Sequence, residues 1–114
     1  MLTIDSLKDF GANTDEGLGR CFNNVDFYLK LVKTVPEEPN FEQLEKAIKG
    51  GDLEAAFEHA HALKGVLANL SLTPISEPAC EITEHLRSKN QIDYAPLLLE
   101  IFKKRDELKK LCDE

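Results

Sequence analysis

The chain has 114 residues, enough for one hydrophobic core and too few for two. Hydrophobic residues make up 42% and charged residues 31%, which is typical of a soluble globular domain and excludes a disordered chain. The formal net charge is −7, and basic residues cluster only in the mixed segment KKRDELKK, so neither a nucleic acid nor an anionic membrane surface is expected as a partner. We expect the partner to be another protein.

Targeting segments and metal or disulfide frameworks are also not expected. No window holds the roughly 18 consecutive apolar residues of a membrane span, and MLTIDSLKDF lacks the basic and apolar regions of a signal peptide. The cysteines at positions 21, 80 and 112 are widely separated and form no CxxC pair. This pattern argues against a disulfide framework or a zinc knuckle and favours a reducing cytoplasm.

Helical periodicity begins near the N-terminus. Ile4, Leu7 and Phe10 predict a short helix that ends at Gly11, whereas the segment from Asp15 to Cys21, with two glycines, predicts only a brief turn. A longer apolar stripe then extends to the proline at position 36, through Val25, Tyr28, Leu29, Val32 and Val35.

The remaining segments predict four longer helices joined by short connections. One begins near Asn40 and ends at Gly50-Gly51, and Asp52 is placed to cap the next, which reaches about residue 70. Thr73-Pro74 is typical of a helix start, although Pro78 leaves a start near residue 76 open. The last helix follows Asp93. The sequence therefore predicts an all-α, antiparallel four-helix bundle with short additional N-terminal helices, forming a single domain over residues 1–114.

His61 lies in the helix that follows Asp52. At about 100° per residue, its apolar positions fall in one arc. They are Leu53, Ala56, Phe57, Ala60, Leu63, Leu67 and Leu70. His61 lies about 120° from the centre of that arc and is predicted to face solvent, whereas His59 lies closer to the core edge. The two histidines diverge by about 160°, too far to chelate one ion, so we expect no metal site.

Two neighbours of His61 suggest a chemical role for it. Lys64 lies on the same side of the helix, where its ammonium can offset the charge of an anion attached to the ring. Gly65 stands mid-helix, where glycine costs about 1 kcal/mol relative to alanine, so it indicates close approach of another molecule. A neutral imidazole is nucleophilic near neutral pH, and phosphoryl transfer needs positioning and charge neutralisation. Together, His61, Lys64 and Gly65 favour phosphoryl transfer as the function. The sequence lacks a phosphate-cradling glycine loop and a carboxylate cluster for Mg²⁺ and ATP, so metal and donor must come with a partner.

The segment GDLEAAFEHAHALKG, followed by VLANLSL, resembles the signature of histidine-containing phosphotransfer (HPt) domains. GLGRCFNNVDFYLKLV is similar to the family's first bundle helices, and the resemblance covers roughly residues 17–88. It implies that His61 carries the phosphoryl group on Nε2, that Lys64 neutralises it and that Gly65 admits the partner's acidic pocket. It implies a phosphorelay intermediate that receives the phosphoryl group from the aspartate of a response-regulator receiver domain and passes it to another. A hybrid sensor histidine kinase is a further implied partner, Mg²⁺ is expected on the receiver, and the chain has no cofactor of its own.

A small exposed surface is expected around His61. We assign receiver binding to Glu58, Ala62, Ala68 and Asn69, and we expect a monomer that forms transient complexes. Some family members place a glutamine on the facing helix; counting without gaps gives Thr83 here, whose hydroxyl could donate a hydrogen bond to the site.

Several residues depart from the family pattern or admit a plainer interpretation. Many members have glycine where Ser71 stands, and Val66 is bulkier than the common alanine or serine. His85 is interpreted as a surface residue. Arg87 could approach His61, although a solvated or ion-paired arginine is the plainer interpretation.

Two other functions remain open. A docking module could bind receiver or kinase domains without being phosphorylated, although docking needs no nucleophile. A small histidine-dependent hydrolase is less favoured, because a general base normally has an orienting partner and none is evident in the sequence. Independent turnover as an enzyme is therefore not expected.

Overall fold

The computed structural model describes residues 2–113, and over that range its regular secondary structure is all helical, without a β-strand. Seven α-helices and one 3-10 helix follow one another along the described chain. Their bounds are α1 Ile4–Phe10, α2 Thr14–Arg20, α3 Val25–Thr34, η1 Val35–Glu37, α4 Asn40–Lys49, α5 Leu53–Asn69, α6 Thr73–Arg87 and α7 Ala95–Asp113. The all-α fold predicted from the sequence is confirmed.

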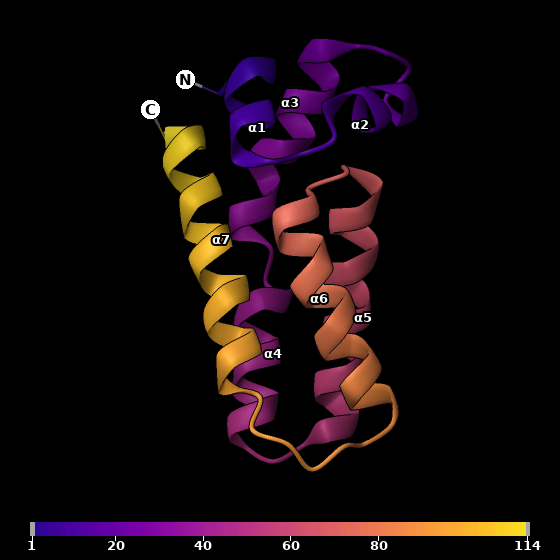
Figure 1. The fold of residues 1–114 in the computed structure, drawn as a ribbon, viewed down its shortest axis with the longest axis vertical. Helices are drawn as coiled ribbons and strands as arrows, with labels where there is room; N and C mark the ends of the chain where they lie inside the picture. The colour runs from indigo at the N-terminus through magenta and orange to yellow at the C-terminus, as the bar shows by residue number, and fades with distance from the viewer. Residues whose placement is uncertain (1, 114) are drawn as a thin grey trace.

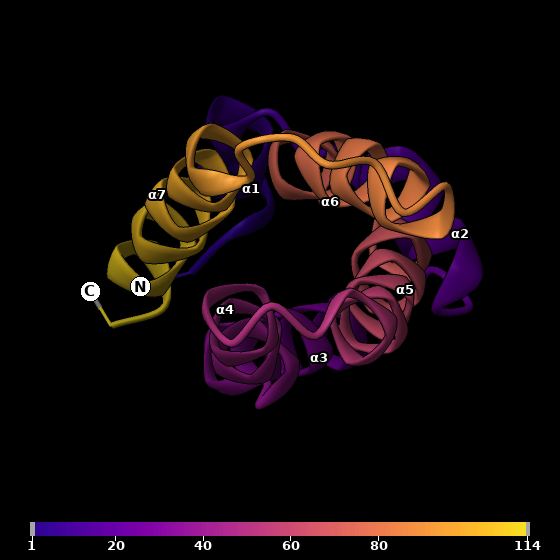
Figure 2. The same cartoon turned by 90° about the horizontal axis from the view of Figure 1, so that it is seen from below.

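Four helices form the body of the molecule. α4, α5, α6 and α7 run along the long axis, and each runs opposite to the one before it (Figure 1). Seen from the end, the same four helices surround a common interior (Figure 2). α3 continues the column of α4, while α1 and α2 cover one end of the bundle (Figure 1). Within residues 2–113, no helix has the length and apolar character needed to cross a membrane.

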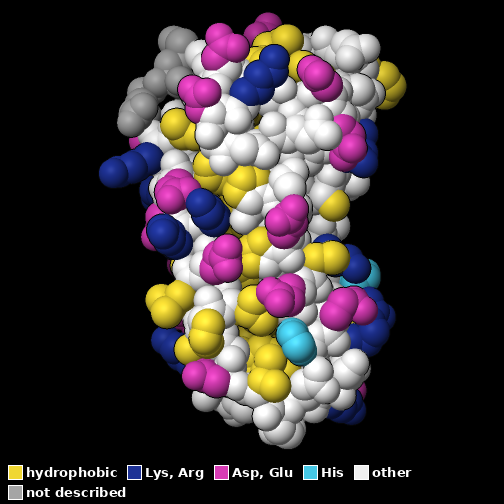
Figure 3. Space-filling view, in the orientation of Figure 1, with side chains coloured by type: hydrophobic (Ala, Val, Ile, Leu, Met, Phe, Trp, Pro, Cys, Tyr) yellow, Lys and Arg dark blue, Asp and Glu magenta, His cyan; other side chains and the backbone are white. Residues whose placement is uncertain are grey.

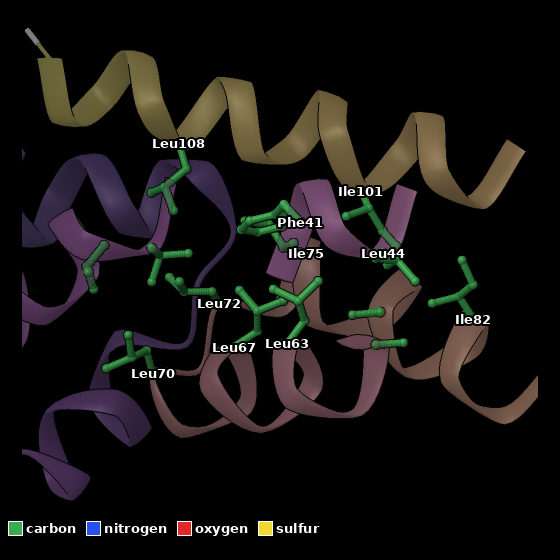
Figure 4. Packing of buried hydrophobic residues seen from close by; sticks show 14 of the residues in the cluster. Phe41, Leu44, Leu63, Leu67, Leu70, Leu72, Ile75, Ile82, Ile101 and Leu108 are labelled. Atoms are coloured by element: carbon green, nitrogen blue, oxygen red, sulfur yellow. The ribbon is translucent and has the colours of Figure 1, made fainter. Parts of the chain in front are cut away.

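The interior is filled by aliphatic and aromatic side chains from all four helices (Figure 4). Leu63 and Leu67 of α5 are completely buried and point toward Phe41 of α4 and Ile75 of α6. Full burial of a leucine stabilises a fold by about 2 kcal/mol, so this row fixes the rotation of α5 about its axis. On the outside, a line of hydrophobic side chains marks the junction of α6 and α7, with charges of both signs beside it (Figure 3). Because Leu63 and Leu67 face the interior, the opposite side of α5 is directed away from the core.

The start of α5 is set by two local features. Gly51 adopts a φ of +76°, a left-handed conformation that glycine tolerates, and it turns the chain out of α4. The Asp52 carboxylate then accepts a hydrogen bond of 3.0 Å from the Ala55 amide and caps the helix, as predicted. These features place the first turn of α5 at a defined residue.

The segment with two glycines near the N-terminus is a helix rather than the brief turn that was predicted. The Asn13 side chain accepts a hydrogen bond of 3.2 Å from the Glu16 amide and begins α2. Gly17 is needed for packing, because a Cβ there would lie 2.6 Å from the Tyr28 ring. A glycine that suggests a flexible turn in the sequence is therefore a contact point between α2 and α3.

The start of α6 also differs slightly from the expectation. The helix begins at Thr73 and not near residue 76, and Leu72 rather than Thr73 occupies the capping position. Pro74 lies in the first turn, where the missing amide hydrogen is tolerated, and Pro78 is accommodated inside the helix as a buried residue. The connection from α5 to α6 is consequently short and tight.

Candidate functional site

One side of α5 is exposed along most of its length. Ala60, Leu63 and Leu67 are buried, whereas His61 is exposed, so the predicted orientation of the helix is confirmed. His61, Gly65 and Ala68 follow one another at spacings of four and three and therefore lie on the same side. We call the exposed side of α5 the His61 face; it consists of Glu58, His61, Ala62, Gly65, Ala68 and Asn69.

The His61 ring packs against Phe57, one turn earlier on the same helix. The ring centroids are 5.7 Å apart, with the planes inclined at 39°. Phe57 is only half-buried, although the helical wheel assigned it to the core, because it stands at the edge between α5 and α6. The aromatic contact gives the exposed imidazole a side-chain support.

Arg87 of α6 reaches the same edge. Its guanidinium carbon lies 5.0 Å from the centroid of the Phe57 ring, within the range of a cation–π contact. Its Nε also lies 3.3 Å from Oε2 of Glu84, so the ion-paired interpretation holds at the same time. A positive charge therefore stands one aromatic ring away from His61, and no sequence pattern indicated the role of Phe57 between them.

Lys64 and Gly65 complete the immediate surroundings of the imidazole. Lys64 is half-buried and lies three residues after His61, where helical neighbours have Cβ atoms about 5–6 Å apart. Gly65 is exposed, and a Cβ added to it would meet no atom within 4 Å. The fold itself thus has no steric need for glycine at this position, in contrast to Gly17.

The other two histidines have structural partners. The half-buried His59 ring donates from Nδ1 to Oδ1 of Asn40 at 2.8 Å, and the Asn40 amide donates to Glu38 at 2.8 Å. His85 is half-buried, and its Nδ1 accepts from the Asn90 amide at 3.0 Å. Nowhere in the described range do three or more His, Cys, Asp or Glu side chains gather as a metal site would need.

Thr83 does not lie at this surface, and its assignment to the binding site is wrong. The side chain is fully buried, and its hydroxyl donates a hydrogen bond of 2.6 Å to the Ala79 carbonyl of the same helix. The position was counted along α6, but the rotation of that helix turns the residue into the core. The hydroxyl is therefore not available to a group on His61.

Ser71 anchors the N-terminal helices to the end of α5. It adopts a φ of +54°, the left-handed conformation for which glycine is favoured. Its hydroxyl accepts from the Arg20 guanidinium at 2.8 Å and donates to the Glu16 carboxylate at 2.8 Å. The hydrogen bond from Ser71 and the charge of Arg20 lower the pKa of Glu16 below its ordinary value. Serine in place of glycine thus gains two polar contacts at a backbone position that strains it.

Comparison with known proteins places this geometry in a family. The Hpt domain model matches residues 31–114, which include the end of α3, all four bundle helices and the His61 face. No curated protein and no solved structure gives a significant match. Hpt domains are phosphotransfer modules of two-component systems and are not independent enzymes. The chain belongs to the Hpt domain family.

Proposed function

We propose that the protein is a phosphorelay intermediate that accepts a phosphoryl group on His61 from the aspartate of a receiver domain and passes it to a second receiver. The observation that carries the proposal is the open surface at Gly65, one turn from an exposed imidazole. A mid-helix glycine costs about 1 kcal/mol relative to alanine, and no atom of the fold compensates for that cost. Close approach of a partner to His61 accounts for the presence of glycine at position 65.

The transfer step balances without a further reactant. The neutral His61 Nε2 attacks the phosphorus of the receiver's acyl phosphate, an N–P bond forms, and the P–O bond to the aspartate breaks. The electron pair of that bond remains on the aspartate carboxylate, and the imidazole keeps its Nδ1 proton. The reverse reaction with a second receiver regenerates the neutral ring. The free energy of the phosphoryl group is passed on, so no cofactor is consumed.

Lys64 and Gly65 have separate roles in this step. The Lys64 ammonium offsets the negative charge that the phosphoryl group brings to the ring, which favours the phosphorylated state. Gly65 allows the receiver's acidic pocket to approach the imidazole without a side chain in between. Phe57 holds the ring at the surface through its 5.7 Å contact.

The rest of the His61 face would contact the receiver around the reacting atoms. Ala62 and Ala68 are small and exposed, and they permit close approach on either side of Gly65. Asn69 and Glu58 are exposed polar residues at the two ends, where they would make hydrogen bonds or influence partner choice. Such an interface is small and suits a complex that forms and separates quickly.

The wider setting of the relay is also part of the proposal. We place Mg²⁺ on the receiver's acidic pocket and assign no cofactor to this chain. The protein would act as a monomer in the cytoplasm, with residues 1–114 as one unit, and a hybrid sensor histidine kinase would supply the first receiver. Support comes from the family's place in two-component systems.

A reconstituted relay tests the proposal. One receiver is phosphorylated with radiolabelled acetyl phosphate, freed of that small donor and mixed with a second receiver in Mg²⁺ buffer, with or without the protein. We expect label to reach the second receiver only when the protein is present, and a His61→Gln variant to abolish that transfer. If receivers bind the protein and label never reaches it, the alternative of a docking module without phosphorylation replaces this proposal.

A further inference from the structure

We propose that the turn between α2 and α3 is a second contact surface for the receiver, which extends the His61 face and selects among receivers. This inference rests on the proposed phosphotransfer function. We call residues 21–24 with the adjoining Val25 and Phe27 the α2–α3 knuckle. It precedes residue 31, where the match to the Hpt domain begins.

Large hydrophobic side chains are unusually exposed on the knuckle. Phe22 is 88% exposed, Val25 43% and Phe27 42%. Only two other large hydrophobic residues in the described chain are comparably exposed, Ile92 and Leu99. The apolar stripe predicted to bury Val25 therefore leaves it at the surface. Three of the five exposed large hydrophobic side chains of the described chain therefore lie within six residues, although Val25 and Phe27, two positions apart on α3, face different sides of that helix. Exposed apolar side chains that gather in this way mark a protein contact.

The backbone of the knuckle is strained in a way that displays Phe22. Phe22 and Asn23 both adopt left-handed conformations, with φ values of +58° and +56°. Asparagine tolerates this region, whereas it is unfavourable for a bulky residue such as phenylalanine. The Asn23 amide donates to the Leu18 carbonyl at 2.7 Å, and the Asn24 side chain accepts from the Phe27 amide at 3.1 Å, which together hold the turn. An exposed phenylalanine at a strained position contributes nothing evident to folding, so a role outside the fold is the economical explanation.

The knuckle is rigidly attached to the end of the His61 face. The Arg20 guanidinium donates to the Ala68 carbonyl at 2.7 Å, and the Tyr28 hydroxyl donates to the Leu70 carbonyl at 2.7 Å. These bonds join the residues on both sides of the turn to the last turn of α5. Both views place α2 beyond the end of the α5–α6 pair, on the side away from α7 (Figure 1, Figure 2).

The size of a typical interface indicates which partner contacts the knuckle. Ala68 lies seven residues from His61, about 10 Å along the helix axis. An interface of about 800 Å² per partner has a radius of roughly 16 Å, so a receiver centred on His61 reaches the end of α5 to which the knuckle is attached. Aromatic side chains at such positions contribute disproportionately to affinity. The receiver that reacts with His61 is therefore the occupant to which we commit.

Phe22→Asn is the decisive variant, because asparagine suits the left-handed backbone and should leave stability equal or higher. Leu99→Gln on α7 is the matched control, since Leu99 is 70% exposed on a different helix. Each receiver domain of the source organism is purified, phosphorylated with acetyl phosphate and Mg²⁺, and mixed with each protein variant. Labelling by phosphoramidate, a donor too small to reach the knuckle, measures the intrinsic reactivity of His61.

We expect Phe22→Asn to slow transfer from the fastest receiver at least fivefold, while Leu99→Gln and phosphoramidate labelling remain at the wild-type rate. Equal rates for Phe22→Asn and wild type would overturn the inference, as would an equal loss in Leu99→Gln. A wild-type protein that is a dimer by light scattering, and that Phe22→Asn converts to a monomer, would assign the knuckle to a second copy instead. If the wild type accepts label from no receiver, the proposed function itself fails. If the wild type accepts label and Phe22→Asn accepts it equally fast, only this further inference fails.

Discussion

The rings of Phe57 and His61 stand one turn apart on α5, with centroids separated by 5.7 Å and planes inclined at 39°. Phe57 is in turn covered by the guanidinium of Arg87 from α6, at 5.0 Å. The imidazole is thus exposed to solvent and yet has a packed neighbour that restricts its orientation. Restricting a reactive group in this way lowers the entropy lost when the partner's phosphoryl group aligns with it.

Replacing Phe57 by leucine should loosen the imidazole while keeping a hydrophobic side chain at the edge of α5 and α6. We expect a loss of about 1 kcal/mol in the free energy of unfolding and a several-fold slower transfer from a receiver. Phe57→Tyr keeps the ring and serves as the control, with transfer near the wild-type rate. Urea denaturation and rapid-mix transfer kinetics measure the two effects. If the Phe57→Leu variant transferred at the wild-type rate, Phe57 would have no role in orienting the His61 imidazole.

Gly65→Ala should separate folding from function. Nothing in the fold lies within 4 Å of the added Cβ, so the helix gains alanine's propensity, about 1 kcal/mol. This gain should raise the melting temperature by about 4 °C. Receiver transfer should fall about tenfold because the methyl group stands where the partner approaches, and phosphoramidate labelling should persist.

The stability control for that experiment lies on another helix. Gly19 is also exposed, and a Cβ there would likewise meet no atom within 4 Å, so Gly19→Ala should stabilise the protein to a similar degree. Calorimetry compares the two variants. If Gly65→Ala melts lower than wild type, glycine at this position has an internal packing role and the interpretation of the open surface fails.

Ser71 offers a test of strain against hydrogen bonding. Ser71→Ala keeps the left-handed backbone strain and loses both contacts with Arg20 and Glu16, so we expect a loss of about 2 kcal/mol. Ser71→Gly loses the same contacts but removes strain of about 1 kcal/mol, and its stability should lie between alanine and wild type. Urea denaturation of the three proteins gives the order. An alanine variant as stable as wild type would show that the polar contacts contribute no net free energy.

The Glu16 carboxylate should make this anchor sensitive to acid. Its pKa is lowered in the folded protein, first by the hydrogen bond from Ser71 and then by the charge of Arg20. A lowered folded pKa means that the contribution to stability is present above the unfolded value, about 4.3, and is lost as the pH falls through the folded pKa. An NMR titration should place the pKa of Glu16 below its unfolded value in the wild type and closer to that value in Ser71→Ala. A pKa above the unfolded value in the wild type would contradict the assigned contacts.

The helices of the bundle and the orientation of α5 were predictable because they depend on local periodicity. Ala60, Leu63 and Leu67 repeat at the helical spacing, and Asp52 caps the start, so the exposure of His61 follows from a single stretch of sequence. Phe57 was assigned to the core by the same rule, since periodicity places a side chain in an arc but does not locate the edge of the neighbouring helix.

The features missed by the sequence depend on residues far apart in the chain. Gly17 was interpreted as a turn residue because its contact, the Tyr28 ring, belongs to another helix. The hydroxyl of Ser71 bonds to Arg20, which is 51 residues away, and no local pattern indicates such a contact. Thr83 was misplaced because a position counted along α6 carries no information on which way that helix is rotated.

The identity of the phosphorylated residue is the central claim, and the three histidines of the chain provide its own controls. Each of His59, His61 and His85 is replaced singly by glutamine. The variants are incubated with Mg²⁺ and a receiver domain that carries a radiolabelled phosphoryl group. We predict that His59→Gln and His85→Gln acquire acid-labile label, whereas His61→Gln acquires none. Label retained by His61→Gln, in a variant shown to be folded by circular dichroism, would contradict the account.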